Sequence, residues 1–377
     1  MAISVIVPVF NGSRYFSAFI DSLQAALPEG AQIIFVDDGS TEPVLEQLPD
    51  IPKAAGKVLI LRNDRNLGYS AAVNRGFSAC DGDFIVQLNT DLVLHPQCIT
   101  SMLELIRSRS NVGVVGSKLL FPTNNLVQHI GMAFGMNTRK HVYFQLPADH
   151  PIVSRTRRMQ ILTGATVAFS RHVLDRLGPL DERYFNYNED IDHCLKAVAL
   201  GMDNYTCAES IAYHWVSQSG PSRFARVRES DAVFWRKWPT GYHVDLGDFV
   251  AEALSHVLDR ETYLADLDFD VLNLCKTSDD IILIEQVRKQ LPLAAAPRHD
   301  HRQVNNNETK YWLPMILPHR YQHEPRPFLY FVDHFHQLNE NRLWFQNRLR
   351  WVREELIVDA TGCVVTASEL LSMGCLP

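Results

Sequence analysis

The tripeptide Asn89-Thr90-Asp91 directly follows the apolar run Phe84–Leu88. A carboxylate at the end of a buried strand can hold Mg²⁺ or Mn²⁺ through oxygen, while a bound diphosphate supplies further ligands. Thr90 and the adjacent amides can bind hydroxyl or phosphate groups. An ordinary turn, capped by Asn and Asp, accounts for the same residues. The tripeptide by itself therefore does not establish a metal site.

A second acidic group, Asp37-Asp38, ends the apolar run Ile33–Val36 and continues into Gly39-Ser40-Thr41. A carboxylate here can accept hydrogen bonds from a base NH or a ribose hydroxyl. A paired acid after a strand also suits a phosphoacceptor or a metal-phosphatase site. The structural alternative is a turn in which Ser40 or Thr41 caps the next helix.

The segment Asn188-Glu189-Asp190 opens a predicted helix that runs to Leu200. Acidic side chains are favoured at a helix N-terminus by the macrodipole, so simple capping explains them. The functional alternative is that Asp190 projects into a crevice as a general base.

His214 ends another apolar run, and an arginine-rich segment follows it. A lone histidine is usually structural, so His214 is a metal-ligand candidate only if it reaches Asp91. Arg223 and Arg226 come after a Ser- and Gly-rich turn. That pattern suits a flap closing on phosphate, and it suits a solvated helix face equally well.

Strand-like and helix-like segments alternate around these residues. Continuous apolar runs predict strands at residues 3–7, 33–36, 58–61, 84–88 and 112–115, with helices between them. This pattern indicates an α/β fold with a mostly parallel sheet flanked by helices. In such a sheet the ligand crevice lies outside the carboxyl ends of the strands. We therefore expect one rim to carry Asn11, Asp38, Asn66 and Asp91.

The sequence changes character near residue 245. No chemical motif follows, but helix-like stretches occur at residues 249–257, 281–291 and 341–356, and residues 297–309 form a polar, linker-like segment. The aromatic stretch around Trp344 and Trp351 has the spacing of packed side chains. We predict a mainly helical region over residues 245–377 that supports stability or acceptor placement.

Composition limits the classes of protein that remain. The chain has 377 residues, of which 46% are hydrophobic and 21% charged, enough for two folded domains. Its net charge of -7 argues against nonspecific nucleic-acid binding. Seven cysteines without a CxxC pair indicate a reducing compartment. The N-terminal apolar run predicts a strand and not a signal peptide, and no stretch is long enough to span a bilayer.

Taken in order, the motifs resemble the nucleotide-sugar glycosyltransferases of family 2, which have the GT-A fold, and within them the rhamnosyl- and galactofuranosyl-transferase-like group. Each matching segment is weak alone, and the ordered set is specific. The resemblance covers about residues 1–240. The matching segments are residues 7–11, 36–40, 66–69, 74–76, 88–91, 162–165, 177–185 and 188–190, with His214 and Lys237-Trp238.

The resemblance implies a role for each matched position. Asp91 would bind the metal, Mg²⁺ or Mn²⁺, and His214 would complete its coordination. Asp190 would be the catalytic base. The nucleotide sugar would be bound by Pro8, Phe10, Asp38, Asn66, Gly68, Asn74, Asn89 and Thr90. The acceptor side or a phosphate-binding flap would include Gly164, Glu189, Arg223 and Arg226.

Two departures from the family pattern qualify these roles. Asn89 stands at the first position of the DXD motif, so the site has one fewer negative charge. The QxxRW motif of processive, membrane-embedded synthases is absent from the sequence. The resemblance therefore implies a nonprocessive enzyme.

The expected function is an inverting, metal-dependent transfer of a sugar from a nucleotide diphosphate to a glycan or lipid-linked acceptor in surface polysaccharide synthesis. Residues 1–116 would bind the donor and residues 117–240 the acceptor. We expect a cytoplasmic protein, with a place at the inner face of the membrane and a homo-oligomer through the C-terminal region both left open. Two alternatives are a sugar-phosphate nucleotidyltransferase, for which Pro8–Gly12 lacks a basic phosphate-gripping residue, and a noncatalytic scaffold.

Overall fold

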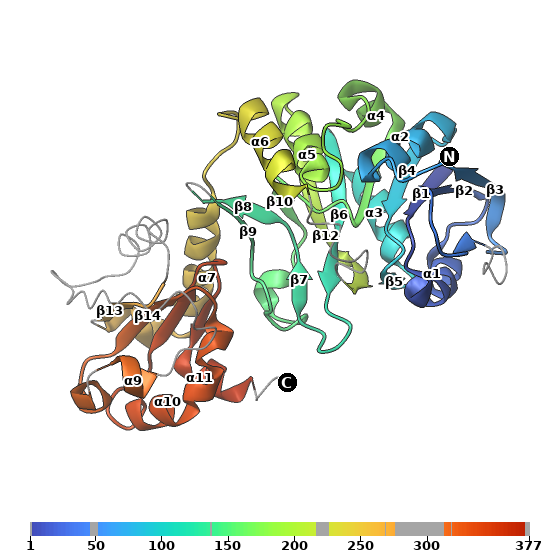
Figure 1. The fold of residues 1–377 in the computed structure, drawn as a ribbon. Helices are drawn as coiled ribbons and strands as arrows, with labels where there is room; N and C mark the ends of the chain where they lie inside the picture. Colours follow the sequence, from blue (N-terminus) through green and yellow to red (C-terminus); the bar gives the residue numbers. More distant parts are fainter. Residues whose placement is uncertain are drawn as a thin grey trace. The chain divides into compact units, whose positions relative to one another are not determined.

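The computed structural model describes residues 2–45, 52–135, 138–215, 226–267, 269–275, 313–317 and 319–373. The chain forms two units, which are described separately (Figure 1). Unit 1 contains residues 1–132 and 145–242, and unit 2 contains residues 133–144 and 243–377. Residues 133–144, which lie within the segment expected to bind the acceptor, thus belong to unit 2.

Unit 1 is built on one large sheet with the strand order β10-β12-β6-β11-β4-β1-β2-β3 in its described part. Strands β4, β1, β2 and β3 run parallel, as do β6 and β12. Strand β11 lies between these two groups and is antiparallel to both neighbours. The predicted α/β class with a mostly parallel sheet is confirmed. The strands are β1 (Ile3–Val9), β2 (Ala31–Asp37), β3 (Ala55–Arg62), β4 (Phe84–Leu88), β5 (Leu92–Leu94), β6 (Val112–Leu120), β7 (Val127–His129), β10 (Arg157–Met159), β11 (Thr166–Ser170) and β12 (Asp203–His214).

Helices cover both faces of this sheet because its central strands are apolar on both sides. Every residue of β1 and β2 is buried. On one face, Val5 and Val7 pack in a core with α1 (Ser13–Ala26) and α3 (Cys98–Ser108). On the other face, Ile6 lies against α2 (Tyr69–Ala79), so closely that a Cβ on Gly76 would meet Ile6 at 2.4 Å.

Three further helices complete unit 1: α4 (Arg171–Leu177), α5 (Glu189–Ala199) and α6 (Val227–Lys237). The predicted helix after Asn188 is confirmed, and Asn188 stands at its N-cap position, but without a capping bond from its side chain. Asn188 has a φ of 76°, no side-chain cap bond forms, and its amide donates to Asp231 instead. Helix α5 also buries Asp192 and His193, which its apolar pattern did not predict.

Unit 2 contains a four-stranded sheet in the order β13-β14-β15-β16, which the sequence did not predict. The first three strands are parallel and the last is antiparallel. The prediction of a mainly helical region is therefore corrected: helices are present, but they surround a sheet. The strands are too short for periodicity to separate them from helix. They are β13 (Asp270–Asn273), β14 (Phe328–Val332), β15 (Leu356–Asp359) and β16 (Val364–Thr366).

The helices of unit 2 match the sequence in part. Helix α7 (Leu246–Arg260) includes the predicted stretch 249–257, whereas α10 (Arg342–Arg348) is much shorter than the predicted 341–356. Trp344 is buried as expected, but Trp351 is 55% exposed. The stretches 281–291 and 297–309 lie outside the described residues. The remaining elements are α9 (Leu313–Ile316), α11 (Ala367–Ser372), β8 (Met132–Phe134), β9 (Arg139–His141) and short 3₁₀ helices.

No helix among the described residues is both long enough and apolar enough to cross a bilayer.

The buried histidine of α5 gives unit 1 a predictable response to acid. His193 lies between the rings of Phe77 and Phe169, and burial lowers its pKa to about 3 from 6.5. Below pH 6.5 the unfolded chain gains a proton at this site that the folded chain does not gain until about pH 3. Stability conferred by neutral His193 is therefore present above pH 6.5 and is lost as pH falls.

We predict that His193→Leu reduces this pH dependence. Between pH 7 and pH 5 the loss in unfolding free energy should be smaller in the variant than in the wild type by about 2 kcal/mol. Urea unfolding of both proteins at the two pH values measures the difference. An unchanged pH dependence would mean that His193 is protonated in the folded protein.

Candidate functional site

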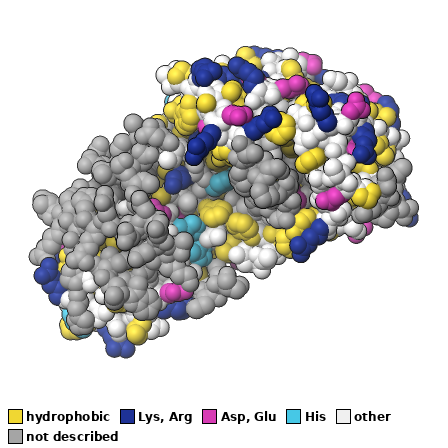
Figure 2. Space-filling model, in the orientation of Figure 1, with side chains coloured by type: hydrophobic (Ala, Val, Ile, Leu, Met, Phe, Trp, Pro, Cys, Tyr) yellow, Lys and Arg dark blue, Asp and Glu magenta, His cyan; other side chains and the backbone are white. Residues whose placement is uncertain are grey.

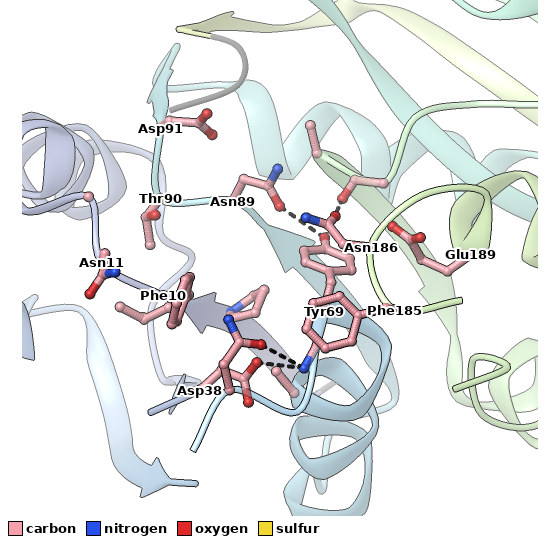
Figure 3. Close-up of a pocket in the computed structure, with 18 of the residues that line it drawn as sticks. Phe10, Asn11, Asp38, Tyr69, Asn89, Thr90, Asp91, Phe185, Asn186 and Glu189 are labelled. Carbon is pink, nitrogen blue, oxygen red and sulfur yellow. Dashed lines mark hydrogen bonds between the residues drawn. The ribbon is translucent and has the colours of Figure 1, made fainter. Parts of the chain in front are cut away.

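A cavity of about 430 Å³ opens at the carboxyl ends of β1, β2 and β4 in unit 1 (Figure 3). Segments from both halves of the unit line it. They include the chain after each of these strands, the start of α1 and α2, and the approach to α5. The lining residues are Pro8, Val9, Phe10, Asn11, Gly12, Tyr15, Asp38, Asn66, Gly68, Tyr69, Ala72, Asn89, Thr90, Asp91, Thr163, Gly164, Ala165, Phe185, Asn186, Glu189, Asp190 and Arg226.

The two acidic residues at the end of β2, Asp37 and Asp38, have different structural roles. Asp37 forms the turn, accepting from the backbone N–H of Ser40 at 2.8 Å and pairing with Arg62. Asp38 faces the cavity and accepts from Asn63 and from the backbone N–H groups of residues 67 and 68 at 2.7–3.0 Å. Burial raises the pKa of Asp38, although these hydrogen bonds favour its charged form. The turn interpretation therefore applies to Asp37, and the binding role of Asp38 stays a prediction.

Gly68 lies where the donor-side loop meets the approach to α5. Its φ of 99° and ψ of 161° lie in a region open essentially only to glycine. A Cβ there would meet the carbonyl oxygen of Phe185 at 2.6 Å. The next N–H, that of Tyr69, donates to this same oxygen at 2.8 Å. The close approach fixes Phe185 at the wall of the cavity.

Tyr69 connects the two halves of the cavity, a role that the sequence analysis missed. Its hydroxyl lies 2.9 Å from Asn89 Oδ1 and 3.0 Å from the carbonyl oxygen of Gly164, and it accepts from Gln87 Nε2 at 2.9 Å. Burial, then the nearby Glu189 and Asp190 charges, raise the pKa of Tyr69 well above 10. The hydroxyl therefore stays protonated and can donate. The sequence signal for this role was that Tyr69 directly follows Asn66-Leu67-Gly68, a segment predicted to bind the nucleotide sugar.

His214 does reach Asp91, the condition on which its metal-ligand role depended. Its Nε2 lies 3.2 Å from Asp91 Oδ1, and both side chains are largely buried. On the other side of the ring, Nδ1 lies 2.6 Å from Gln128 Oε1, while Gln128 Nε2 donates to the backbone oxygen of His214. That second bond orients the amide so that Nδ1 must carry the proton. A lone pair on Nε2 then faces a carboxylate oxygen.

Two acceptors at this distance repel each other unless a cation or a proton lies between them, so the pair fits a divalent metal. Among the described residues, no group of three or more His, Cys, Asp or Glu side chains is arranged to hold a metal ion. Asp91 and His214 would therefore supply only part of a coordination sphere. The remaining ligands would have to come from water or from a bound molecule.

Asp190 and Glu189 line the cavity from the first turn of α5. Asp190 accepts from the backbone N–H of Gly164 at 2.8 Å through Oδ2, and Oδ1 accepts from the N–H of Ile191. Glu189 turns back to accept from the N–H of Tyr187 at 2.6 Å. A carboxylate has about four lone-pair positions, so bonding to these two N–H groups is compatible with accepting a proton.

The remaining predicted site residues divide into three groups. Pro8, Phe10, Asn66, Thr90 and Arg226 line the cavity, and the Arg226 guanidinium lies 4.4 Å from the centre of the Phe185 ring. Asn74 does not line it, because both ends of its amide bond the backbone of Leu180. Arg223 lies outside the described residues.

Comparison with known proteins relates this chain to a protein family. Residues 4–178 match the family described as Glycosyl transferase family 2. The uncharacterized protein y4gI of Sinorhizobium fredii is 29% identical over 252 residues, 63% of this chain and 28% of that protein. The O-antigen biosynthesis protein RfbC of Myxococcus xanthus is 29% identical over 247 residues, 62% of this chain and 18% of that protein. The chain thus spans less than a third of either relative.

Similar folds are also found among solved structures. The crystal structure of S. aureus TarS 1-349 gives a TM-score of 0.45 at 16% identity, covering 78% of this chain and 81% of that one.

We predict that the cavity wall tolerates a methyl group at Gly12 but not at Gly68. Gly68→Ala should lower the unfolding free energy by about 3 kcal/mol, because it combines a glycine-only conformation with a backbone collision. Gly12→Ala, the matched control, should cost about 1 kcal/mol, because its φ is also positive but no atom lies within 4 Å of the new Cβ. Urea unfolding measures both, and equal losses would contradict the close approach of Phe185.

Proposed function

We propose a specific reaction for this chain, whose residues 4–178 match glycosyl transferase family 2. The reaction is transfer of a sugar from a nucleoside diphosphate to a hydroxyl group of a glycan or lipid-linked acceptor, with inversion at the sugar. One observation carries the proposal. A single cavity brings together Asp38, Asp91 and Asp190, which come from three separate segments.

The donor would lie along the edge formed by β1, β2 and β4. Phe10 offers a flat apolar surface for the nucleobase, next to buried Pro8. Asp38, with Asn66 and Gly68 beside it, offers acceptors and backbone groups for the base and ribose. Asn89 and Thr90 would contact the ribose or the sugar. Ligand pockets commonly combine apolar and aromatic surfaces with a few precisely placed polar groups that fix the orientation of the ligand.

Asp91 and His214 would hold a divalent metal, Mg²⁺ or Mn²⁺, between them. When bound, the metal would neutralise negative charge that develops on the departing diphosphate. Arg226 lines the same cavity and would add a positive charge for the phosphate oxygens. The asparagine at position 89 leaves this region with one carboxylate fewer than a DXD motif, which makes the contribution of Arg226 more important.

Asp190 would act as the general base. It takes the proton from the acceptor hydroxyl while that oxygen attacks the anomeric carbon from the face opposite the diphosphate. Gly164 holds the carboxylate through its N–H, which keeps one oxygen in place. Glu189, on the same turn of helix, would border the acceptor.

The biological setting is proposed from the relatives. One of them is named for O-antigen biosynthesis, which supports a place in surface polysaccharide synthesis.

Asp190→Asn tests the base. The amide keeps the size of the side chain and can still accept from Gly164, but it cannot take a proton. We expect kcat to fall about 10²-fold or more, with donor affinity unchanged. The exposed carboxylate of Asp175 on α4 provides the control, since Asp175→Asn should leave turnover intact. Near-normal turnover in Asp190→Asn would remove this residue from the mechanism.

The metal is tested by chelation and by Asp91→Ala. Both should abolish transfer and weaken binding of a nucleoside diphosphate about tenfold or more, because a bridging cation is lost. Binding of the corresponding nucleoside, which has no phosphate, should change little and serves as the control. Calorimetric titration with the nucleoside diphosphate and with the nucleoside, each with Mn²⁺ present and after its removal, measures both affinities. Full activity in chelator would indicate a metal-independent enzyme that relies on Arg226.

A further inference from the structure

Behind the cavity, a buried ionic cluster joins α5 to the end of α6. At its centre is Asp192, two residues after Asp190. Successive helical residues are turned by about 100°, so the two carboxylates point to nearly opposite sides of α5. Asp190 faces the cavity, whereas the side chain of Asp192 is 1% exposed and faces protein. Asp192 takes no part in the mechanism proposed above.

Two consecutive residues at the end of α6 bind this carboxylate. Lys237 Nζ lies 2.8 Å from Asp192 Oδ1 and 3.0 Å from Oδ2, and Trp238 Nε1 donates to Oδ1 at 2.8 Å. Lys237 also pairs with Asp181 at 2.9 Å, on the segment that leads to α5. Arg183 and then Lys237 hold the pKa of Asp181 well below its usual range. Lys237 therefore bridges two carboxylates that flank the chain entering α5.

The first turn of α5 is also bound from α6 at a second point. Asn188 stands just before it in a left-handed conformation and makes no capping bond to the helix. Helix ends without caps open readily, because their first N–H groups lack partners within the helix. The side-chain amide of Asn188 instead donates to Asp231 Oδ1 on α6 at 3.0 Å. Two restraints on the start of α5 thus come from α6, in addition to the bond from the Gly164 N–H to Asp190.

The same helix α6 reaches the cavity at its other end. Arg226, immediately before Val227, lies over the Phe185 ring and lines the cavity. We propose that Lys237 and Trp238 are positioning residues, which lock α6 to α5 so that Asp190 and Arg226 keep a fixed separation. This inference rests on the proposed function for its catalytic consequence. It goes beyond that function by assigning a role to residues outside the cavity.

The physical reason is the burial of Asp192. A carboxylate removed from water must be paired, and loss of Lys237 would leave Asp192 with Lys196, at 3.5 Å, as its cationic partner. If Lys237 is removed, Asp192 regains solvation only by moving, and the first turn of α5 moves with it. Small displacements of a reacting group can cost up to about 10²-fold in rate. Donor binding should be spared, because Phe10, Asp38 and Gly68 come from other elements.

Lys237→Met is the test, and Lys196→Met is its matched control. Lys196 also lies near Asp192, at 3.5 Å, but it belongs to α5 itself and cannot link the two helices. We expect Lys237→Met to lower kcat by about 10- to 100-fold, with the donor dissociation constant changed by less than about threefold. Lys196→Met should change both by less than about threefold. Lys237→Arg, which keeps the charge and can bridge two carboxylates, should recover most of kcat.

Amide hydrogen exchange provides a readout that does not depend on activity. The amides of residues 188–193 should exchange faster in Lys237→Met and at the wild-type rate in Lys196→Met. Should Lys237→Met fail to fold, Trp238→Phe removes the N–H donor together with part of the ring and should give the same pattern with a smaller change, about three- to tenfold in kcat.

Each outcome decides the proposal. Unchanged exchange at the start of α5 in both Lys237→Met and Trp238→Phe would overturn it, as would equal effects of Lys237→Met and Lys196→Met. Faster exchange with normal kcat, in a protein that Asp190→Asn inactivates, would also overturn it, because α5 would then need no positioning. If Asp190→Asn retains turnover, the proposed base is wrong, while the exchange measurement still decides whether Lys237 holds α5.

Discussion

Strand β1 pairs in parallel with both β2 and β4, and this arrangement determines where the chemistry of unit 1 can lie. Parallel strands end at the same edge, so the chain leaving each of them enters the same space. Asn11, which follows β1, accepts from the backbone N–H groups of Thr41 and Glu42, which follow β2. These bonds join the loops after the two strands directly. The cavity forms where the loops after these strands lie next to one another. Its lining is polar in part because backbone groups at strand ends need hydrogen-bond partners.

The second half of the cavity is attached to the first by shared polar contacts. The carbonyl oxygen of Gly164 accepts from Gln87 on β4, and the N–H of the same residue donates to Asp190 on α5. Strand β11 begins just beyond, antiparallel to β4. A Cβ at position 164 would meet Asp190 at 3.1 Å and Gln87 at 3.2 Å, so a small residue allows this three-way contact. The position of Asp190 thus depends on the sheet as well as on its own helix.

Unit 2 is organised around a buried ion pair of its own. Arg348 and Glu355 are both fully buried and 2.7 Å apart, and Arg348 also donates to backbone oxygens of Tyr321 and Glu324. Tyr330 on β14 donates to Glu355, and Trp344 on α10 donates to Tyr330. Such a network is stable only when every member is paired, so it favours one arrangement of helices around the sheet. The same demand for partners fixes Asp192 in unit 1.

The sequence by itself determined the α/β class of unit 1, the edge that carries the polar residues and most of the cavity lining, because these follow from local periodicity and from strand order. It also named His214 as a metal-ligand candidate, but only on the condition that His214 reaches Asp91. It did not reveal the sheet of unit 2, because runs such as Phe328–Val332 are too short to show a period. Only the tertiary structure decided that Asp37 forms a turn while Asp38 faces the cavity, that Asn74 bonds Leu180, and that Tyr69 and Lys237 join distant segments. Side-chain partners of this kind lie up to about a hundred residues apart in the chain, and no local pattern specifies them.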